Sequence, residues 1–174
     1  MKRFTLAASL LTVAMFAAST ADAQQRVARG ARANGAGGVT AGQVHDRTGP
    51  NGGTVRGARG VATAADGRAI AGSANCATGD AGRACRAGVT TRNAEGDVEH
   101  KSGVRVEGAN GGELESTGGF TKAAEGGVTQ ARTTDASNAN GSVSVDSSYT
   151  TETGRSRTVT CANPAGEIVA CPTH

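Results

Sequence analysis

Glycines that close short turn-forming clusters recur at a nearly constant spacing along the chain. Successive members of the series are 15 residues apart, except for one interval of 14 between Gly82 and Gly96. Most follow Asn, Asp or Glu, and Asn-Gly and Asp-Gly pairs are typical of two-residue hairpin turns, because both central residues tolerate positive φ. The spacing therefore predicts one reversal of the chain per unit. The series is Gly37, Gly52, Gly67, Gly82, Gly96, Gly111, Gly126 and Gly141.

The segments between these glycines are rich in Val, Thr and Ser, and some alternate between apolar and polar residues, as residues 104–107 and 142–146 do. This pattern indicates strands. We predict an all-β fold, an elongated antiparallel meander of ~15-residue repeats with strands of about 13 residues. Gly103 and Gly118 are expected to form bulges or bends in it. A β-solenoid and a largely disordered low-complexity chain are the alternatives.

Large apolar residues are scarce after residue 23, where Val is joined only by Ile70, Ile168, Leu114, Phe120 and the lone tyrosine, Tyr149. Chains with less than about 20% Leu, Ile, Val and Phe rarely bury enough surface to offset the entropy of ordering. A layered hydrophobic core is therefore not expected. A single sheet with few large apolar side chains on its faces needs stacking, self-association or a partner to be stable.

The first 23 residues have the pattern of a removable export signal. Lys2 and Arg3 precede an apolar stretch at 6–18, and a small-x-small motif at 21–23 predicts cleavage after Ala23. The chain is therefore predicted to be periplasmic or extracellular, with no membrane span after signal removal. We expect a flexible Arg/Gly/Ala arm at 24–37, a repeat region at 38–154 and a disulfide-stapled hairpin at 155–174.

Four cysteines in an exported chain permit three disulfide pairings. Cys76 and Cys85 are placed symmetrically about a tight turn, and Cys161 and Cys171 flank residues 163–166, a second turn signal. The spacing predicts Cys76 with Cys85 and Cys161 with Cys171. No metal site is expected, because neither pair has Cys-x-x-Cys spacing and the histidines are scattered.

Charge is distributed unevenly along the chain. Residues 24–92 contain ten Arg and three Asp, whereas residues 93–174 contain six basic and eleven acidic side chains. The first half is a candidate polyanion-binding segment, although the same charges also serve to keep a repeat array soluble. Contact between the basic half of one copy and the acidic half of another would favour linear assembly. The candidate polyanion-binding residues are Arg26, Arg29, Arg32, Arg56 and Arg59.

The chain has none of the motifs of the common hydrolase, phosphate-binding, zinc-protease or dinucleotide sites, so we expect no enzyme activity and no cofactor. Its units ending in Ala-x-Gly, as at 94–96 and 109–111, resemble those of small secreted Gly/Ala/Thr-rich repeat proteins of Gram-negative bacteria. It is also loosely similar to curli-type fibre subunits, but lacks their Gln/Asn ladder spacing. The resemblance implies a surface or matrix role.

These observations lead to two hypotheses about function. The first is a secreted, non-enzymatic structural or adhesive repeat protein of the cell envelope or extracellular matrix, capable of self-association. The alternative is a module whose Arg-rich first half binds an acidic polysaccharide or another polyanion. Salt separates the two, because binding driven by charge weakens steeply as ionic strength rises.

Overall fold

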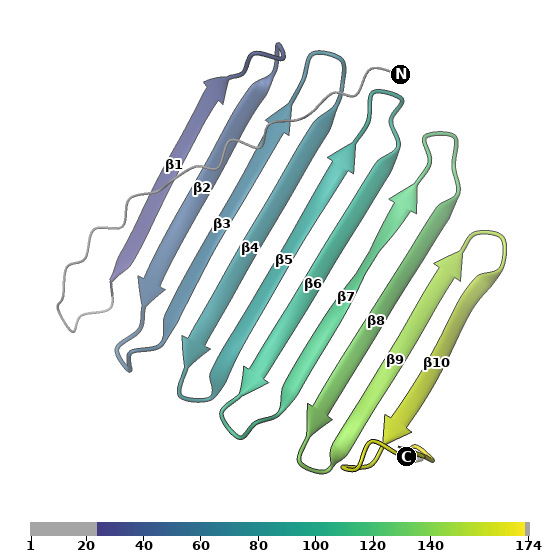
Figure 1. Ribbon diagram of the computed structural model, residues 1–174. Helices are drawn as coiled ribbons and strands as arrows, with labels where there is room; N and C mark the ends of the chain where they lie inside the picture. The colour runs from purple at the N-terminus through teal and green to yellow at the C-terminus, as the bar shows by residue number, and fades with distance from the viewer. Residues whose placement is uncertain (1–23, 173–174) are drawn as a thin grey trace.

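The computed structural model describes residues 24–172, and the predicted export signal lies outside the described residues. Eleven strands form one sheet in chain order, and every neighbouring pair is antiparallel (Figure 1). The predicted all-β antiparallel meander is confirmed, and the solenoid is excluded. The strands are β1 (Gln25–Ala33), β2 (Val39–Thr48), β3 (Thr54–Thr63), β4 (Ala69–Gly79), β5 (Gly82–Arg92), β6 (Val98–Gly108), β7 (Glu113–Lys122), β8 (Val128–Asn138), β9 (Gly141–Thr150), β10 (Gly154–Ala162) and β11 (Ile168–Val169).

Each glycine of the 15-residue series lies at a turn and has positive φ. In most of these turns, the carbonyl oxygen of the residue three positions before the glycine accepts the glycine N–H. The N–H of that same residue donates to the carbonyl oxygen of the residue that follows the glycine. Asn93 makes both hydrogen bonds, the first with Gly96 and the second with Asp97. This is a type I turn followed by a glycine bulge. The predicted two-residue turn with positive φ at both central positions is wrong, because no described non-glycine residue has positive φ.

The strands are shorter and more regular than the sequence predicts. The ten long strands have 9 to 11 residues, because each turn occupies several residues of every unit. Gly103 pairs in register with Ala87 and Thr117, and Gly118 pairs with Ser102 and Arg132. Neither glycine interrupts the ladder, so the expectation of bulges or bends there is wrong.

Two expectations about the ends of the chain also need correction. The segment expected to be a flexible arm forms strand β1, because residues 25–33 pair in register with all but the last residue of β2. At the other end, β11 pairs only with Cys161 and Ala162, so most of the outer edge of β10 has no neighbouring strand. The C-terminal hairpin is therefore much shorter than predicted.

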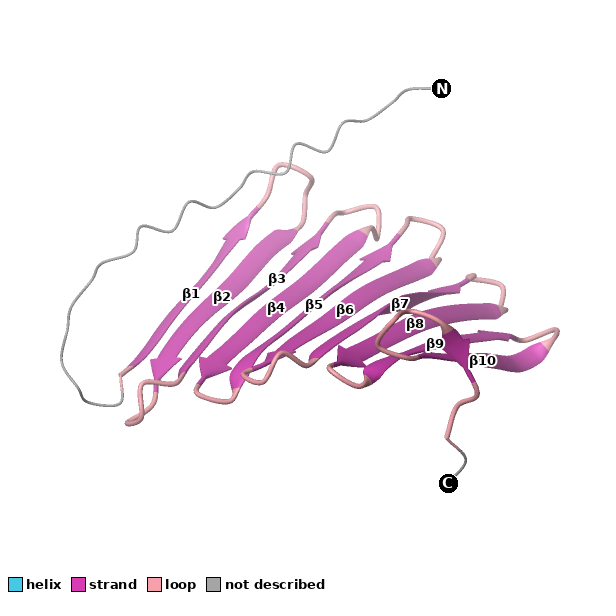
Figure 2. Cartoon of the chain, turned by 60° about the horizontal axis from the view of Figure 1, so that its bottom comes forward, coloured by secondary structure: helices cyan, strands magenta, loops and turns pink. Residues whose placement is uncertain are grey.

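The sheet is one layer thick, as the turned view in Figure 2 shows. The backbone of each strand packs only against the strands that precede and follow it in sequence. Among residues 24–172 no hydrophobic side chain is buried, and Ser116 is the sole buried residue. Backbone pairing and contacts between adjacent strands therefore hold the fold together, without a core between layers.

Candidate functional site

The sheet has two chemically different faces. Side chains alternate between faces along a strand, and residues directly opposite on neighbouring strands share a face. We call the face that carries Arg29, Arg59 and Arg132 the basic face, and the face aligned with Gly30, Gly60 and Gly119 the mixed face. Contacts such as that of Thr90 with His100, both on the basic face, agree with this assignment.

Carboxylates are confined to one face. At the strand positions of the described chain, the basic face carries no Asp or Glu, and none of its cations forms an ion pair. The mixed face carries acids and bases together, and three ion pairs form on it: Arg56 with Asp46, Lys101 with Glu99, and Arg105 with Glu107. The cations of the basic face are Arg29, Arg47, Arg59, Arg86, Arg92, Lys122, Arg132, Arg155 and Arg157.

Large apolar side chains are also concentrated on the basic face. On the long strands the mixed face has only Val44, Ile70 and Val89 of this type. Several apolar residues of the basic face remain well exposed, with Val39 at 49%. The large apolar residues of the basic face on β1–β10 are Val27, Val39, Val55, Val61, Val98, Val104, Val106, Leu114, Phe120, Val128, Val143, Val145, Tyr149 and Val159.

A polar row crosses the middle of the basic face from β1 to β10, perpendicular to the strands. We call it the central row. Four arginines stand in it, and hydroxyl, amide and glycine residues lie between them, with no apolar side chain. In strand order the row is Arg29, Gln43, Arg59, Ser73, Gly88, Ser102, Gly118, Arg132, Ser147 and Arg157.

Arg132 is fixed in this row by serine hydroxyls on two other strands. Its Nη1 donates to Ser116 Oγ at 2.9 Å, and its Nη2 donates to Ser102 Oγ at 3.1 Å. The guanidinium reaches Ser102 by passing over Gly118, the residue between them in the row. Ser116 in turn hydrogen-bonds Thr134 at 2.8 Å. The burial of Ser116 beneath this network explains why a polar residue is the one buried among those described.

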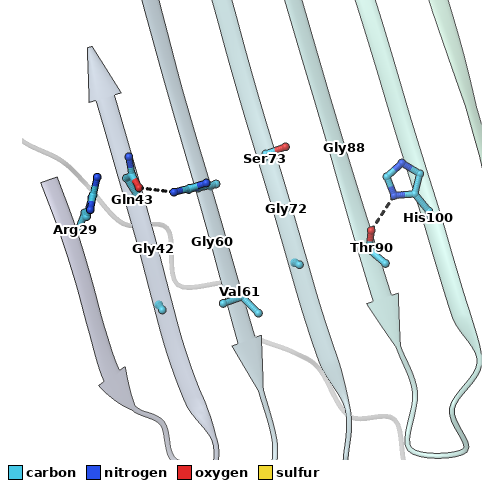
Figure 3. Close-up of a pocket in the computed structure, with 13 residues that line it drawn as sticks. Arg29, Gly42, Gln43, Gly60, Val61, Gly72, Ser73, Gly88, Thr90 and His100 are labelled. Atoms are coloured by element: carbon cyan, nitrogen blue, oxygen red, sulfur yellow. Dashed lines mark hydrogen bonds between the residues drawn. The ribbon is translucent and has the colours of Figure 1, made fainter. Parts of the chain in front are cut away.

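The N-terminal part of the central row forms the floor of a shallow hollow of about 520 Å³, which extends from β1 to β6. Figure 3 shows Arg29, Gln43 and Ser73 at nearly the same level on their strands. Arg59 Nη2 donates to Gln43 Oε1 at 2.8 Å. The Arg29 side chain makes no hydrogen bond or ion pair, so its guanidinium donors are free for a ligand.

The far end of the hollow is bounded by His100. Its Nδ1 hydrogen-bonds Thr90 Oγ1 at 2.8 Å, and its ring stacks on that of Phe120 with centroids 5.4 Å apart. The two rings therefore pack against each other across β6 and β7, and Phe120 remains 36% exposed.

A second hollow, of about 750 Å³, lies largely on the mixed face around Gly119. Glu99 and Lys101 line it and pair with each other at 2.8 Å. Since its charges are internally compensated, this hollow is a weaker candidate for a charged ligand.

The arginines predicted from sequence do not form one site. Arg29 and Arg59 share the basic face, whereas Arg26, Arg32 and Arg56 lie on the mixed face. Arg56 is paired with Asp46 at 3.0 Å.

Sequence analysis missed Arg132 and Arg157, which lie in the half of the chain with excess acid. The signal that would have found them is the strand register, because it aligns them with Arg29 and Arg59.

Both predicted disulfides are present. Cys76 and Cys85 are directly opposite on β4 and β5 with Cα atoms 4.1 Å apart, and Cys161 joins Cys171 with Cα atoms 5.3 Å apart. The first bridge lies on the mixed face and the second ties the segment after β11 to β10. The described part of the chain has no free cysteine.

Two turn carboxylates have lowered pKa values. The backbone N–H of Arg68, followed by its guanidinium, lowers the pKa of Asp66. The backbone N–H of Ala124, followed by the Asn93 amide, lowers the pKa of Asp97. Asp97 accepts from Ala124 at 2.9 Å and thereby links two turns at the same end of the sheet. These groups stabilise the ends of the sheet and are not part of either face.

Within residues 24–172 no group of His, Cys, Asp and Glu is arranged to hold a metal ion, and no helix there is long and apolar enough to cross a membrane. No protein-family model matches the chain, and no match is found among curated proteins or solved structures. The chemistry of the two faces is therefore the basis for assigning a function.

Proposed function

We propose that this is an exported, non-enzymatic protein of the cell envelope or extracellular matrix with a structural or adhesive role. The observation that carries the proposal is the single-layer sheet with no buried hydrophobic residue among those described. Such a sheet becomes more stable when another molecule covers one of its faces. The two disulfides support an oxidising compartment.

The faces are better suited to this contact than the edges. Arginines stand on both edge strands, Arg29 and Arg32 on β1 and Arg155 and Arg157 on β10. Pairing β1 of one copy with β10 of another would bring these like charges together, and charged edge residues are a common protection against such pairing. We therefore expect contact through a face to dominate over growth at the edges.

The test is to express the full chain with an epitope tag after residue 174 in a Gram-negative host and to fractionate the culture. We expect mass spectrometry to find cleavage after Ala23, and we expect the product to be retained by washed envelopes or matrix. An uncleaved product in the cytoplasm, or an exported product that washes off completely at low salt, would contradict the proposal. A tagged protein of similar size and net charge is the control for passive trapping.

Polyanion binding by the Arg-rich first half is the second candidate. The absence of strand carboxylates from the basic face of the described chain favours binding of an anion there. Because the five predicted arginines are divided between two faces, a polyanion site on the basic face would include only Arg29 and Arg59 among them. Salt-dependent retention in the fractionation experiment would favour this candidate over contact driven by apolar surface.

A further inference from the structure

We propose that the central row of the basic face is a binding track for a linear acidic polysaccharide that lies across the strands. This inference rests on the proposed adhesive function and names its ligand class. The track uses Arg29 and Arg59 near one end and Arg132 and Arg157 near the other.

The arginines of the track have no carboxylate partner on their own face. The basic face has no strand carboxylate among the described residues, so nothing on it neutralises these arginines. By contrast, Arg56 on the same strand as Arg59 already has Asp46 as its partner on the mixed face. An incoming anion therefore meets no competing strand carboxylate on the basic face, whereas Arg32 and Arg83 on the mixed face share that face with carboxylates. Guanidinium groups are suited to bidentate contact with carboxylate or sulfate.

The spacing of the arginines suits an extended ligand. Arg29 and Arg59 are two strands apart, as are Arg132 and Arg157, so each pair spans about 10 Å at the usual distance between strands. The whole track from β1 to β10 crosses nine inter-strand distances, or about 43 Å. An extended polymer with regularly placed charges matches this geometry, whereas one small anion would contact a single arginine.

Between the arginines of the row, Ser73, Ser102 and Ser147 carry hydroxyl groups, and Gly88 and Gly118 keep the floor of the row low. Ser102 Oγ accepts from Arg132 and Ser147 Oγ donates to the Arg132 carbonyl oxygen, so these two keep part of their hydrogen-bonding capacity for a ligand. Sugar hydroxyls both donate and accept hydrogen bonds, so a row of hydroxyl side chains suits a sugar backbone. The hollow of about 520 Å³ gives such a chain a place at the β1–β6 end.

A single-stranded nucleic acid fits the same row less well. Binders of that class stack bases on aromatic side chains, and the central row contains none. In the neighbouring row His100 and Phe120 already stack on each other. A second copy of this chain is a less extended match, because Asp46, Glu99 and Glu107 of its mixed face are held in its own ion pairs. The mixed-face carboxylates outside these pairs, Glu113, Glu115, Asp135 and Asp146, lie on β7–β9 only, whereas the arginines of the track extend from β1 to β10.

The experiment measures binding of the secreted chain, residues 24–174 with both disulfides intact, to alginate, a linear polymer of uronic acids. The test variant is R29Q/R59Q on the basic face. The matched control is R32Q/R56Q, which removes two charges from the same two strands on the mixed face. Circular dichroism and unfolding midpoints establish that both variants are folded.

We expect R29Q/R59Q to weaken alginate binding at least tenfold and R32Q/R56Q less than twofold. Arg157→Gln should weaken binding severalfold, because the track extends beyond the Arg-rich half. Affinity should rise with the length of alginate oligomers until they span the sheet, and neutral dextran should not bind.

Equal losses for R29Q/R59Q and R32Q/R56Q would overturn the proposal, because binding would then depend on overall charge and not on one face. Tighter binding to single-stranded DNA or to vesicles of anionic phospholipid than to alginate would overturn the ligand class. Concentration-dependent self-association that R29Q/R59Q abolishes would assign the face to a second copy of the chain. A chain that is exported and retained in the matrix but does not bind alginate would refute the track while leaving the proposed function intact.

Discussion

The basic and mixed faces are built by the same ten long strands, yet they differ in chemistry. The basic face holds unpaired cations and most of the large apolar side chains, while the mixed face holds the strand carboxylates and its own ion pairs. The imbalance that appears along the sequence as a basic half and an acidic half is thus also an imbalance across the sheet. Charge summed over a segment does not reveal it, because neighbours in sequence point to opposite faces.

The largest expected effect comes from removing the Cys76–Cys85 bridge on the mixed face. Replacing both cysteines by Ala should lower the free energy of unfolding by about 2–3 kcal/mol, since a small closed loop is released in the unfolded chain. If the faces act independently, alginate affinity should not change while the sheet remains folded. Urea unfolding measures the loss of stability, and a binding assay measures the affinity for alginate. A loss of alginate affinity in the folded variant would show that the two faces do not act independently.

Two glycines on adjacent strands, Gly118 of the basic face and Gly103 of the mixed face, differ in the space around them. A Cβ on Gly118, on the basic face, would lie 2.8 Å from Arg132 Cα and 2.5 Å from the Ala131 carbonyl oxygen, so Gly118→Ala should cost about 1–3 kcal/mol. A Cβ on Gly103, on the mixed face, would be no closer than 3.7 Å to its neighbours, so Gly103→Ala should be neutral or stabilising by up to about 1 kcal/mol. Thermal unfolding of both variants measures this, and equal midpoints would refute the close approach at Gly118.

Substituting Arg132 tests the serine network of the basic face. Arg132→Ala removes two hydrogen bonds to Ser116 and Ser102, and we expect a loss of about 1–2 kcal/mol in unfolding free energy. Arg157→Ala is the control, because the Arg157 side chain makes no hydrogen bond or ion pair, and this variant should stay within about 0.5 kcal/mol of the parent. Equal stability of the two variants in urea titrations would mean that the network contributes nothing.

The smallest effect is expected at the ends of the sheet, outside both faces. Folding lowers the pKa of Asp97 from 3.8, so its ionised form stabilises the fold above that pH, and the contribution is lost as pH falls through the folded pKa. Asp97→Ala should therefore have a slightly lower unfolding midpoint at pH 7. The difference from the parent should shrink below about pH 4. A difference that is independent of pH would assign the effect to packing alone.

Much of the architecture follows from local signals. Glycine is required where φ is positive, so the 15-residue series marked where the chain turns, and the Val/Thr-rich segments between indicated strands. The disulfide partners followed from their symmetric placement about turns. The type of turn was not predictable in the same way, because Asn-Gly suits both a two-residue turn and the type I turn with a glycine bulge that forms here.

The candidate site was less predictable. The clustering of arginines in the first half of the sequence predicts all five as one candidate set, but only Arg29 and Arg59 share the basic face. Residues 25–33 resemble a flexible arm because they are rich in Arg, Gly and Ala with few large apolar side chains, yet pairing with β2 satisfies their backbone groups and orders them.

The sequence by itself determined the turns, the strands and the disulfide pairs, since each depends on residues close together in the chain. Only the tertiary structure decided which residues share a face, because a shift of one residue in register moves every side chain of a strand to the other side. That register brings Arg29, Arg59, Arg132 and Arg157 into one row although more than a hundred residues separate the first from the last.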